Sequence, residues 1–209
     1  MMSNAEIAKF NMIEQQMRPW EVLDPQVLAV INEFNREDFV PERYRGLAYA
    51  DCQIPLGEGS SMFPPTIEGR MLQALLIEPD DLILEVGTGS GYITACLAKL
   101  GQRVVTLDTN AEAQTKAKEC TDQYGLENIE FETANALAHQ YDQAFDVIAV
   151  TGSVISVPEN LKQAMAIGGR MFIICGQSPV MQALLITRAN ANEWTVQSLF
   201  ETDLPALTG

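Results

Sequence analysis

The sequence predicts an α/β fold whose core is a doubly wound, mostly parallel sheet that ends in an antiparallel hairpin. First, the apolar run Leu82–Val86 has the composition of a fully buried strand, and a glycine-rich turn and a helical apolar pattern follow it. Second, strand-like and helix-like segments alternate from residue 80 onward, which is typical of parallel sheets covered by helices. Third, only the turn-forming stretch 190–192 separates the last two apolar runs, which predicts a hairpin.

Residues 1–78 predict a helical extension and a loop, whereas 79–209 predict the sheet domain. Asp24 before Pro25 is typical of an N-cap followed by proline at the first helical position. The stretch 50–65 is rich in glycine, serine and proline, so we expect an extended segment and a loop there. Helices are expected at 4–18, where Pro19 ends the apolar pattern, at 25–34, in a short turn after Pro41, and from Thr66 to a point before Pro79.

In the second part, the pattern predicts helices between successive strands. Asn110 is a suitable N-cap for one of them, and Gly125 lies just beyond its end, where a left-handed residue often terminates a helix. The strands are expected at 82–86, 103–108, 129–133, 145–150, 169–175, 181–188 and 194–200, and the helices at 91–100, 111–124 and 158–165.

The composition argues against several classes of function. The formal net charge is −15 and lysine and arginine are not clustered, so the basic face that a nucleic-acid binder needs is missing. Four widely spaced cysteines and a single histidine, His139, predict reduced thiols, a cytoplasmic location and no metal site. The sequence has no GxSxG hydrolase motif, no signal pattern and no apolar run near the ~20 residues of a membrane span. We therefore expect neither a nucleic acid nor a membrane as partner.

The glycine-rich turn 87–91 predicts a binding crevice. Its glycines let the backbone approach a ligand closely, and the first N–H groups of the next helix point toward that ligand. The spacing is GxGxG, with an acid near the strand end, and differs from the GxGxxG of dinucleotide-binding loops. This form resembles the first motif of S-adenosylmethionine-dependent methyltransferases; a plain strand-to-helix turn is the alternative. The candidate cofactor ligands here are Glu85, Gly87, Thr88, Gly89, Ser90 and Gly91.

Polar side chains also follow the next three strands, at the carboxyl edge where open parallel sheets bind ligands. Asp108 ends the second strand, where an acid can accept hydrogen bonds from both ribose hydroxyls; a solvated cap of the next helix is the alternative. Asn135 follows the third strand, where methyltransferases often carry an acid for the adenine amine, and its carbonyl can accept the same bond. Thr151 follows the fourth strand. Together with the adjacent Thr109 and Ala136, these residues complete the expected S-adenosylmethionine site.

Seven segments resemble protein-L-isoaspartate O-methyltransferases. They are MIEQQMR at 12–18, DFVP at 38–41, LAYAD at 47–51, IPLGEG at 54–59, EVGTGSGY at 85–92, Phe145–Thr151 and GGR at 168–170. The resemblance spans nearly the whole chain and implies the Rossmann-like methyltransferase fold. It also implies a cytoplasmic repair enzyme that methylates the stray carboxylate of isoaspartyl residues in damaged proteins and converts S-adenosylmethionine to S-adenosylhomocysteine.

The chain departs from this family at the expected acceptor site. After the IPLGEG-like segment the family typically reads Gln-Thr-Ile-Ser-Gln-Pro, and its serine contacts the isoaspartyl substrate. Here that serine falls on Phe63 and the threonine on Ser61, and a phenylalanine ring cannot donate a hydrogen bond to a carboxylate. The run SSMFPPTIEGRMLQAL resembles a divergent bacterial branch that carries the family name by overall similarity. We expect Ser60 and Ser61 to orient the acceptor, and Phe63 to form a wall of the pocket.

A carboxylate acceptor is already ionised at neutral pH, so its methylation needs no general base. That chemistry suits a chain with one histidine. The missing serine leaves two alternatives open: methylation of a different acceptor, including an unidentified small molecule, and a non-catalytic module that binds S-adenosylmethionine. A dehydrogenase is disfavoured by the glycine spacing and by the terminal hairpin.

Overall fold

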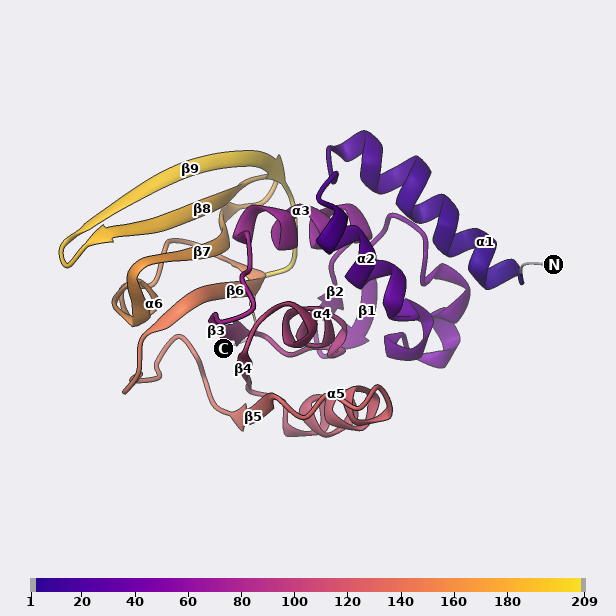
Figure 1. Cartoon of the computed structure of the whole chain (residues 1–209), viewed down its shortest axis with the longest axis horizontal. Helices are drawn as coiled ribbons and strands as arrows, with labels where there is room; N and C mark the ends of the chain where they lie inside the picture. The colour runs from indigo at the N-terminus through magenta and orange to yellow at the C-terminus, as the bar shows by residue number, and fades with distance from the viewer. Residues whose placement is uncertain (1–2, 208–209) are drawn as a thin grey trace.

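The main sheet of the computed structural model, which describes residues 3–207, has the strand order β5-β4-β3-β6-β7-β8-β9. The strands from β5 to β7 in this order run parallel, and β8 pairs antiparallel with both β7 and β9. The predicted sheet and its antiparallel ending are therefore confirmed (Figure 1). The strands are β3 (Leu82–Val86), β4 (Arg103–Asp108), β5 (Ile129–Thr133), β6 (Phe145–Val154), β7 (Met165–Gln177), β8 (Val180–Asn190) and β9 (Glu193–Thr202).

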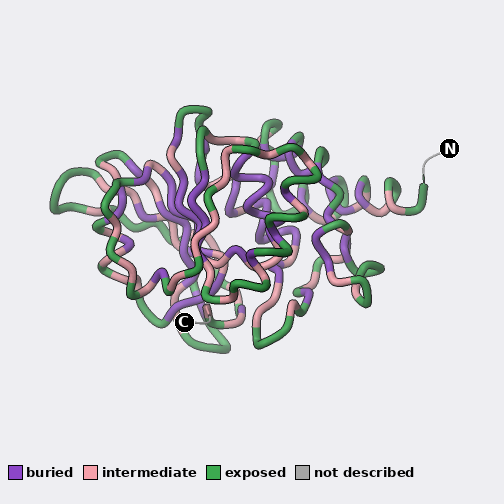
Figure 2. The backbone as a smooth tube through the Cα atoms, turned by 90° about the horizontal axis from the view of Figure 1, so that it is seen from below, coloured by how far each residue is buried: buried purple, intermediate pink, exposed green. Residues whose placement is uncertain are grey.

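Two hydrophobic cores cover the two faces of this sheet. Ile83 and Val147 belong to the core shared with the N-terminal helices, and their chain neighbours Leu84 and Ile148 belong to the core on the other face. Successive strand residues point to opposite faces, so both faces are apolar and the strands read as continuous apolar runs. Figure 2 shows the buried backbone gathered in the sheet and the exposed backbone in the outer turns.

Most helices pack on the first of these cores. In Figure 1, α1 lies at the opposite end of the molecule from the β8–β9 hairpin. The second core is covered by α6 and by the chain around Ala136 and Tyr141. The helices are α1 (Asn4–Asn11), α2 (Pro25–Glu33), α3 (Pro65–Leu75), α4 (Tyr92–Leu100), α5 (Ala111–Gln123) and α6 (Glu159–Ala164).

Two predicted caps are confirmed. The Asp24 carboxylate accepts hydrogen bonds from the N–H groups of Gln26 and Val27 at the start of α2. The Asn110 side-chain oxygen accepts from two N–H groups at the start of α5 in the same way. Such caps satisfy amide groups that have no partner within the helix, so they fix where each helix begins.

The N-terminal part differs from the prediction in detail. The expected helix 4–18 is divided into α1, a π-helical turn η1 (Met12–Met17) and a 3₁₀ turn η2 (Arg18–Trp20) that contains Pro19. Met12 and Met17 are buried, whereas Phe10, which the expected apolar face included, is exposed. Two 3₁₀ turns, η3 (Arg36–Phe39) and η4 (Glu42–Leu47), occupy the stretch around Pro41.

The expected loop 50–65 contains a short β-hairpin. Its strands are β1 (Ile54–Gly57) and β2 (Ser60–Met62), and they pair antiparallel. Helix α3 follows and ends at Leu75, because Leu76 adopts a left-handed conformation with φ of 44°. The hairpin faces the carboxyl edge of the main sheet, so its residues line the crevice described below.

Candidate active site

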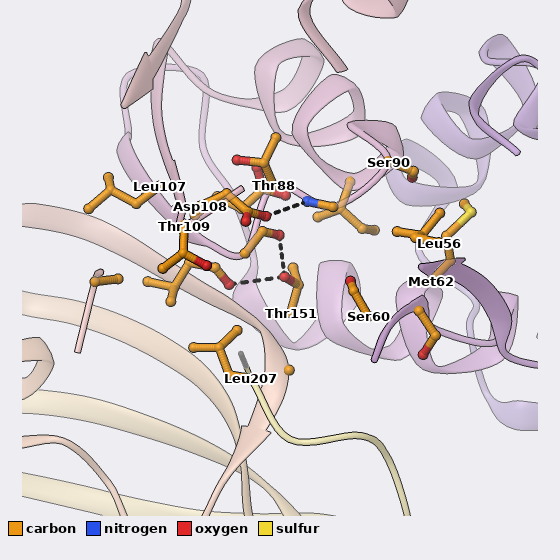
Figure 3. A pocket seen from close by; sticks show the side chains of 18 of the residues that line it. Leu56, Ser60, Met62, Thr88, Ser90, Leu107, Asp108, Thr109, Thr151 and Leu207 are labelled. Atoms are coloured by element: carbon orange, nitrogen blue, oxygen red, sulfur yellow. Dashed lines mark hydrogen bonds between the residues drawn. The ribbon is translucent and has the colours of Figure 1, made fainter. Parts of the chain in front are cut away.

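One crevice lies at the carboxyl ends of β3, β4 and β6, between the main sheet and the β1–β2 hairpin (Figure 3). The crevice brings together residues at or just after the ends of β3, β4 and β5 and residues in the last part of β6. Nearly all of the predicted site residues line it: Ser60, Ser61, Glu85, Gly87, Thr88, Gly89, Ser90, Asp108, Thr109, Asn135, Ala136 and Thr151, together with Phe63. Gly91 is the predicted ligand that does not line it.

The glycines of the turn have distinct roles. Gly87, Gly89 and Gly91 all have positive φ values, of 96°, 52° and 82°. A Cβ atom at Gly87 would lie 2.5 Å from the Thr151 hydroxyl oxygen, so glycine is needed for the close approach of β3 and β6. A Cβ atom at Gly91 would lie 2.7 Å from the Cβ of Ala117 in α5. Gly91 therefore serves the packing of α4 on α5.

Asp108 faces the glycine turn. One carboxylate oxygen accepts a hydrogen bond from the Gly89 N–H at 3.0 Å, as drawn in Figure 3, and the other accepts from the Asn110 N–H at 2.9 Å. The carboxylate thus holds the turn against the start of α5 while it lines the crevice. Each carboxylate oxygen has a further lone pair that can accept a bond from a ligand hydroxyl.

Glu85 lies on the crevice floor and is fully buried. Its Oε2 atom accepts hydrogen bonds from the hydroxyls of Thr94 and Thr106, each at 2.6 Å. Within residues 3–207 its Oε1 atom is buried without a hydrogen-bond partner. Burial raises the pKa of the Glu85 carboxyl to about 8, against the lowering effect of the two threonine hydroxyls.

The polar groups at the ends of β5 and β6 already have partners within the protein. The Thr151 hydroxyl lies 2.9 Å from the carbonyl oxygen of Val86 and also contacts the Gly87 carbonyl, so it fixes the end of β3 (Figure 3). The Asn135 side-chain oxygen, which we expected to serve the adenine amine, accepts a hydrogen bond from the Leu137 N–H at 2.9 Å. Ala136 is buried beside it.

The hairpin forms the opposite wall. Phe63 is buried and lines the crevice with Leu56 and Met62, so the predicted apolar wall is present. The Ser61 hydroxyl oxygen is buried and, among the described residues, has no hydrogen-bond partner. A buried hydroxyl without a partner is unfavourable, so this oxygen is available to a polar group of a ligand.

Sequence reasoning missed the chain after β9. Pro205, Ala206 and Leu207 line the crevice, and Ala206 forms a parallel β-bridge with Ser153 of β6. The Leu207 side chain approaches the positions where Cβ atoms would stand on Gly87 and Gly152. No local pattern in the sequence indicates this return, because it depends on contacts between distant segments.

Two further observations describe residues 3–207. No group of three or more His, Cys, Asp and Glu side chains in this part of the chain is arranged to hold a metal ion, and His139 lies beside Glu132 at 3.7 Å. No helix among these residues has both the length and the apolar character needed to cross a membrane.

Comparison with known proteins identifies the family of the chain. Residues 8–204 match the family model described as protein-L-isoaspartate(D-aspartate) O-methyltransferase. The chain is 40% identical over 181 residues to the protein-L-isoaspartate O-methyltransferase of Koribacter versatilis, which covers 86% of this chain and 81% of the relative. It is 34% identical over 200 residues to protein-L-isoaspartate O-methyltransferase 2 of Marinobacter nauticus, with 95% and 91% covered.

The fold is similar to solved structures over nearly its full length. A crystal structure from Plasmodium falciparum, described as a protein-L-isoaspartate O-methyltransferase in complex with S-adenosyl-L-homocysteine, superposes with a TM-score of 0.81 at 20% identity. The alignment covers 99% of both chains. The family model and the relatives confirm the resemblance found in the sequence. The chain belongs to the protein-L-isoaspartate(D-aspartate) O-methyltransferase family.

Proposed function

We infer that the protein transfers a methyl group from S-adenosylmethionine to the carboxylate of isoaspartyl residues in proteins or peptides. The observation that carries this inference is the family match over residues 8–204, which include the glycine turn and the β1–β2 hairpin of the crevice. The alternatives of another acceptor and of a non-catalytic binding module are not favoured, because relatives that share 32–40% identity carry the isoaspartyl name.

The residues of the sheet edge fit the cofactor. The unpartnered Glu85 Oε1 atom can accept a hydrogen bond from the amino group of the methionine part, beside the glycine turn. Asp108 would hold the ribose hydroxyls, and Asn135 with Ala136 would hold the adenine. We propose that Glu85, Gly87, Thr88, Gly89, Ser90, Asp108, Thr109, Asn135, Ala136 and Thr151 form the cofactor site, with Gly91 contributing through helix packing.

When bound, S-adenosylmethionine supplies a methyl group on a positively charged sulfur. The protein then has to position the acceptor carboxylate and to exclude water from it. Ser60 and Ser61 would orient that carboxylate, and Phe63 with Leu207 would exclude water with apolar surface. An ionised carboxylate needs no general base, so no proton has to be removed before transfer.

Other properties follow from the same proposal. Segment 1–78 supplies the acceptor wall, and segment 79–209 supplies the cofactor site. The four cysteines are free, which supports a reducing, cytoplasmic location. The net charge of −15 supports protein or peptide partners over nucleic acids, and we propose no membrane partner.

The proposed function is tested with an isoaspartyl peptide and the same peptide containing ordinary aspartate. We expect methyl transfer to the first peptide only. The Ser61→Ala variant should raise the KM for the peptide by about tenfold or more, because a hydrogen bond to a charged group contributes about 1.5–3 kcal/mol. The matched control is Ser178→Ala, because Ser178 does not line the crevice.

The possible failures are distinct. Unchanged kinetics in Ser61→Ala would remove the role assigned to that hydroxyl. Tight binding of S-adenosylhomocysteine by calorimetry without turnover of the isoaspartyl peptide would favour another acceptor or a binding module. Binding of NAD in place of S-adenosylhomocysteine would overturn the methyltransferase function itself.

A further inference from the structure

The Arg36 guanidinium lies at the base of the β1–β2 hairpin and is fully buried. Two of its nitrogens donate to the two carboxylate oxygens of Glu68 in α3, each at 2.9 Å. The remaining contacts go to backbone carbonyls: Nη1 donates to Ala48 at 2.6 Å, and Nη2 donates to Phe63 at 2.7 Å. A guanidinium can make all of these hydrogen bonds simultaneously, because its N–H donors are held in one rigid plane.

These two carbonyls flank the hairpin in the chain. Ala48 precedes β1, and Phe63 follows β2 directly. One guanidinium therefore ties together both ends of the segment that carries Ser60 and Ser61. A short two-stranded hairpin is only marginally stable by itself, so its position depends on such anchors.

The same pair also contacts the crevice lining and the helix that follows the glycine turn. Glu68 lines the crevice beside Phe63. The Arg36 guanidinium lies over the ring of Tyr92, 5.5 Å from its centroid, and Tyr92 is the first residue of α4 after the glycine turn. Arg36 thus connects the acceptor wall, α3 and the start of α4.

Stability alone is a weak reason for this arrangement. Desolvation of two charges offsets most of their attraction, and apolar replacements of buried ion pairs are often as stable as the pair. What an apolar pair cannot provide is the directed hydrogen bonding to the Ala48 and Phe63 carbonyls. The pair is therefore suited to fix a loop geometry.

We propose that Arg36 and Glu68 are positioning residues. They hold the β1–β2 hairpin in place relative to the cofactor site and so determine how well the acceptor binds. The proposal rests on the proposed function for its acceptor. Neither side chain is assigned a chemical step, and both act through the hairpin that they anchor.

The test compares two variants with the wild type. Arg36→Lys keeps the positive charge but removes the planar set of guanidinium donors. The double variant Arg36→Met with Glu68→Leu removes both charges. For each folded variant we expect the KM for the isoaspartyl peptide to rise about tenfold or more, because small misplacements of a site are costly, with kcat changed less than about threefold. Binding of S-adenosylhomocysteine should be unchanged within about threefold.

The matched control is a second ion pair, which lies beside the amino end of β3. Arg170 pairs with Asp81 at 2.5 Å and also donates to the Leu75 and Leu76 carbonyls. Asp81→Asn removes a comparable pair outside the crevice lining. It should lower the urea midpoint and leave the KM for the peptide at its wild-type value.

Amide hydrogen exchange over residues 48–63 gives a readout that does not need the acceptor. We expect faster exchange there in both Arg36 variants and unchanged exchange in Asp81→Asn. Wild-type KM and wild-type exchange in either folded Arg36 variant would overturn the proposal. If the wild type turned over no isoaspartyl peptide while exchange still increased in the Arg36 variants, the proposed function would fall and the anchoring role would be supported.

Discussion

Burial in the crevice changes the ionisation of one side chain, the Glu85 carboxyl group. Burial raises its pKa from 4.5 to about 8, and the hydroxyls of Thr106 and Thr94 only partly oppose this rise. In the cofactor-free protein this group is therefore mainly neutral at pH 7. A positively charged amino group beside its free oxygen would favour the ionised form, which links cofactor binding to proton release.

This pKa predicts a pH-dependent stability. Between about pH 4.5 and pH 8 the unfolded chain releases the Glu85 proton while the folded protein retains it. Over that window, a rise in pH should lower the free energy of unfolding of the cofactor-free wild type by roughly 3–5 kcal/mol relative to Glu85→Gln. Urea unfolding of both proteins at several pH values measures this difference, and a difference that stays constant with pH would contradict the raised pKa.

The contact between α4 and α5 illustrates what a glycine does at the scale of elements. Gly91 precedes α4 in a left-handed conformation, and the absent side chain lets Ala117 of α5 approach. Because Asn110, the N-cap of α5, lies two residues after Asp108, this packing also sets where the Asp108 carboxylate lies in the crevice. The element contact and the site geometry are thus connected.

Substitution of this glycine should affect stability. Gly91→Ala adds left-handed strain and a clash with Ala117, so we expect a loss of about 2–4 kcal/mol in the free energy of unfolding. Gly125→Ala is the control, because it has φ of 69° with nothing within 4 Å of its Cβ position, and it should lose only about 1 kcal/mol. Urea unfolding of both variants compares them; equal losses would show that the approach of α5 does not require Gly91.

In the molecule as a whole, two segments that lie far apart in the chain complete the crevice. The β1–β2 hairpin covers one side of the sheet edge, and the chain after β9 returns to cover the end of β6. The Ser153 hydroxyl lies 3.0 Å from the carbonyl oxygens of Leu204 and Pro205, and the Leu207 N–H donates to the Ser153 carbonyl at 2.8 Å. These bonds hold Leu207 over the glycine turn.

Loss of the Ser153 hydroxyl should release this segment. We expect Ser153→Ala to increase amide exchange at residues 206–207 and to lower the free energy of unfolding by about 1 kcal/mol, since a buried carbonyl loses its donor. Ser178→Ala removes an exposed hydroxyl that bonds to the Asp203 carboxylate and should leave the exchange of residues 206–207 unchanged. Equal exchange in the two variants would show that Ser153 does not hold the segment.

Local patterns predicted a large part of this architecture. The apolar run at Leu82–Val86, the caps Asp24 and Asn110, and the alternation of strands and helices are all properties of neighbouring residues. Parallel strands bring their carboxyl ends to one edge, so the sequence also indicated that Asp108, Asn135 and Thr151 would meet. The π-helical turn at 12–17 and the β1–β2 hairpin were not predicted, because burial against distant segments selects them.

Periodicity, glycine spacing and motifs are local features of the chain, so they were enough to predict the sheet, the crevice at its carboxyl edge and the family. Packing in the folded protein, by contrast, selects which polar groups remain without hydrogen-bond partners and which are already bonded. Glu85 and Ser61 each keep a free oxygen, whereas Thr151 and Asn135 bond to the backbone. The pairing of Arg36 with Glu68 and the return of Leu207 also arose there, because they join segments that come together only when the chain packs.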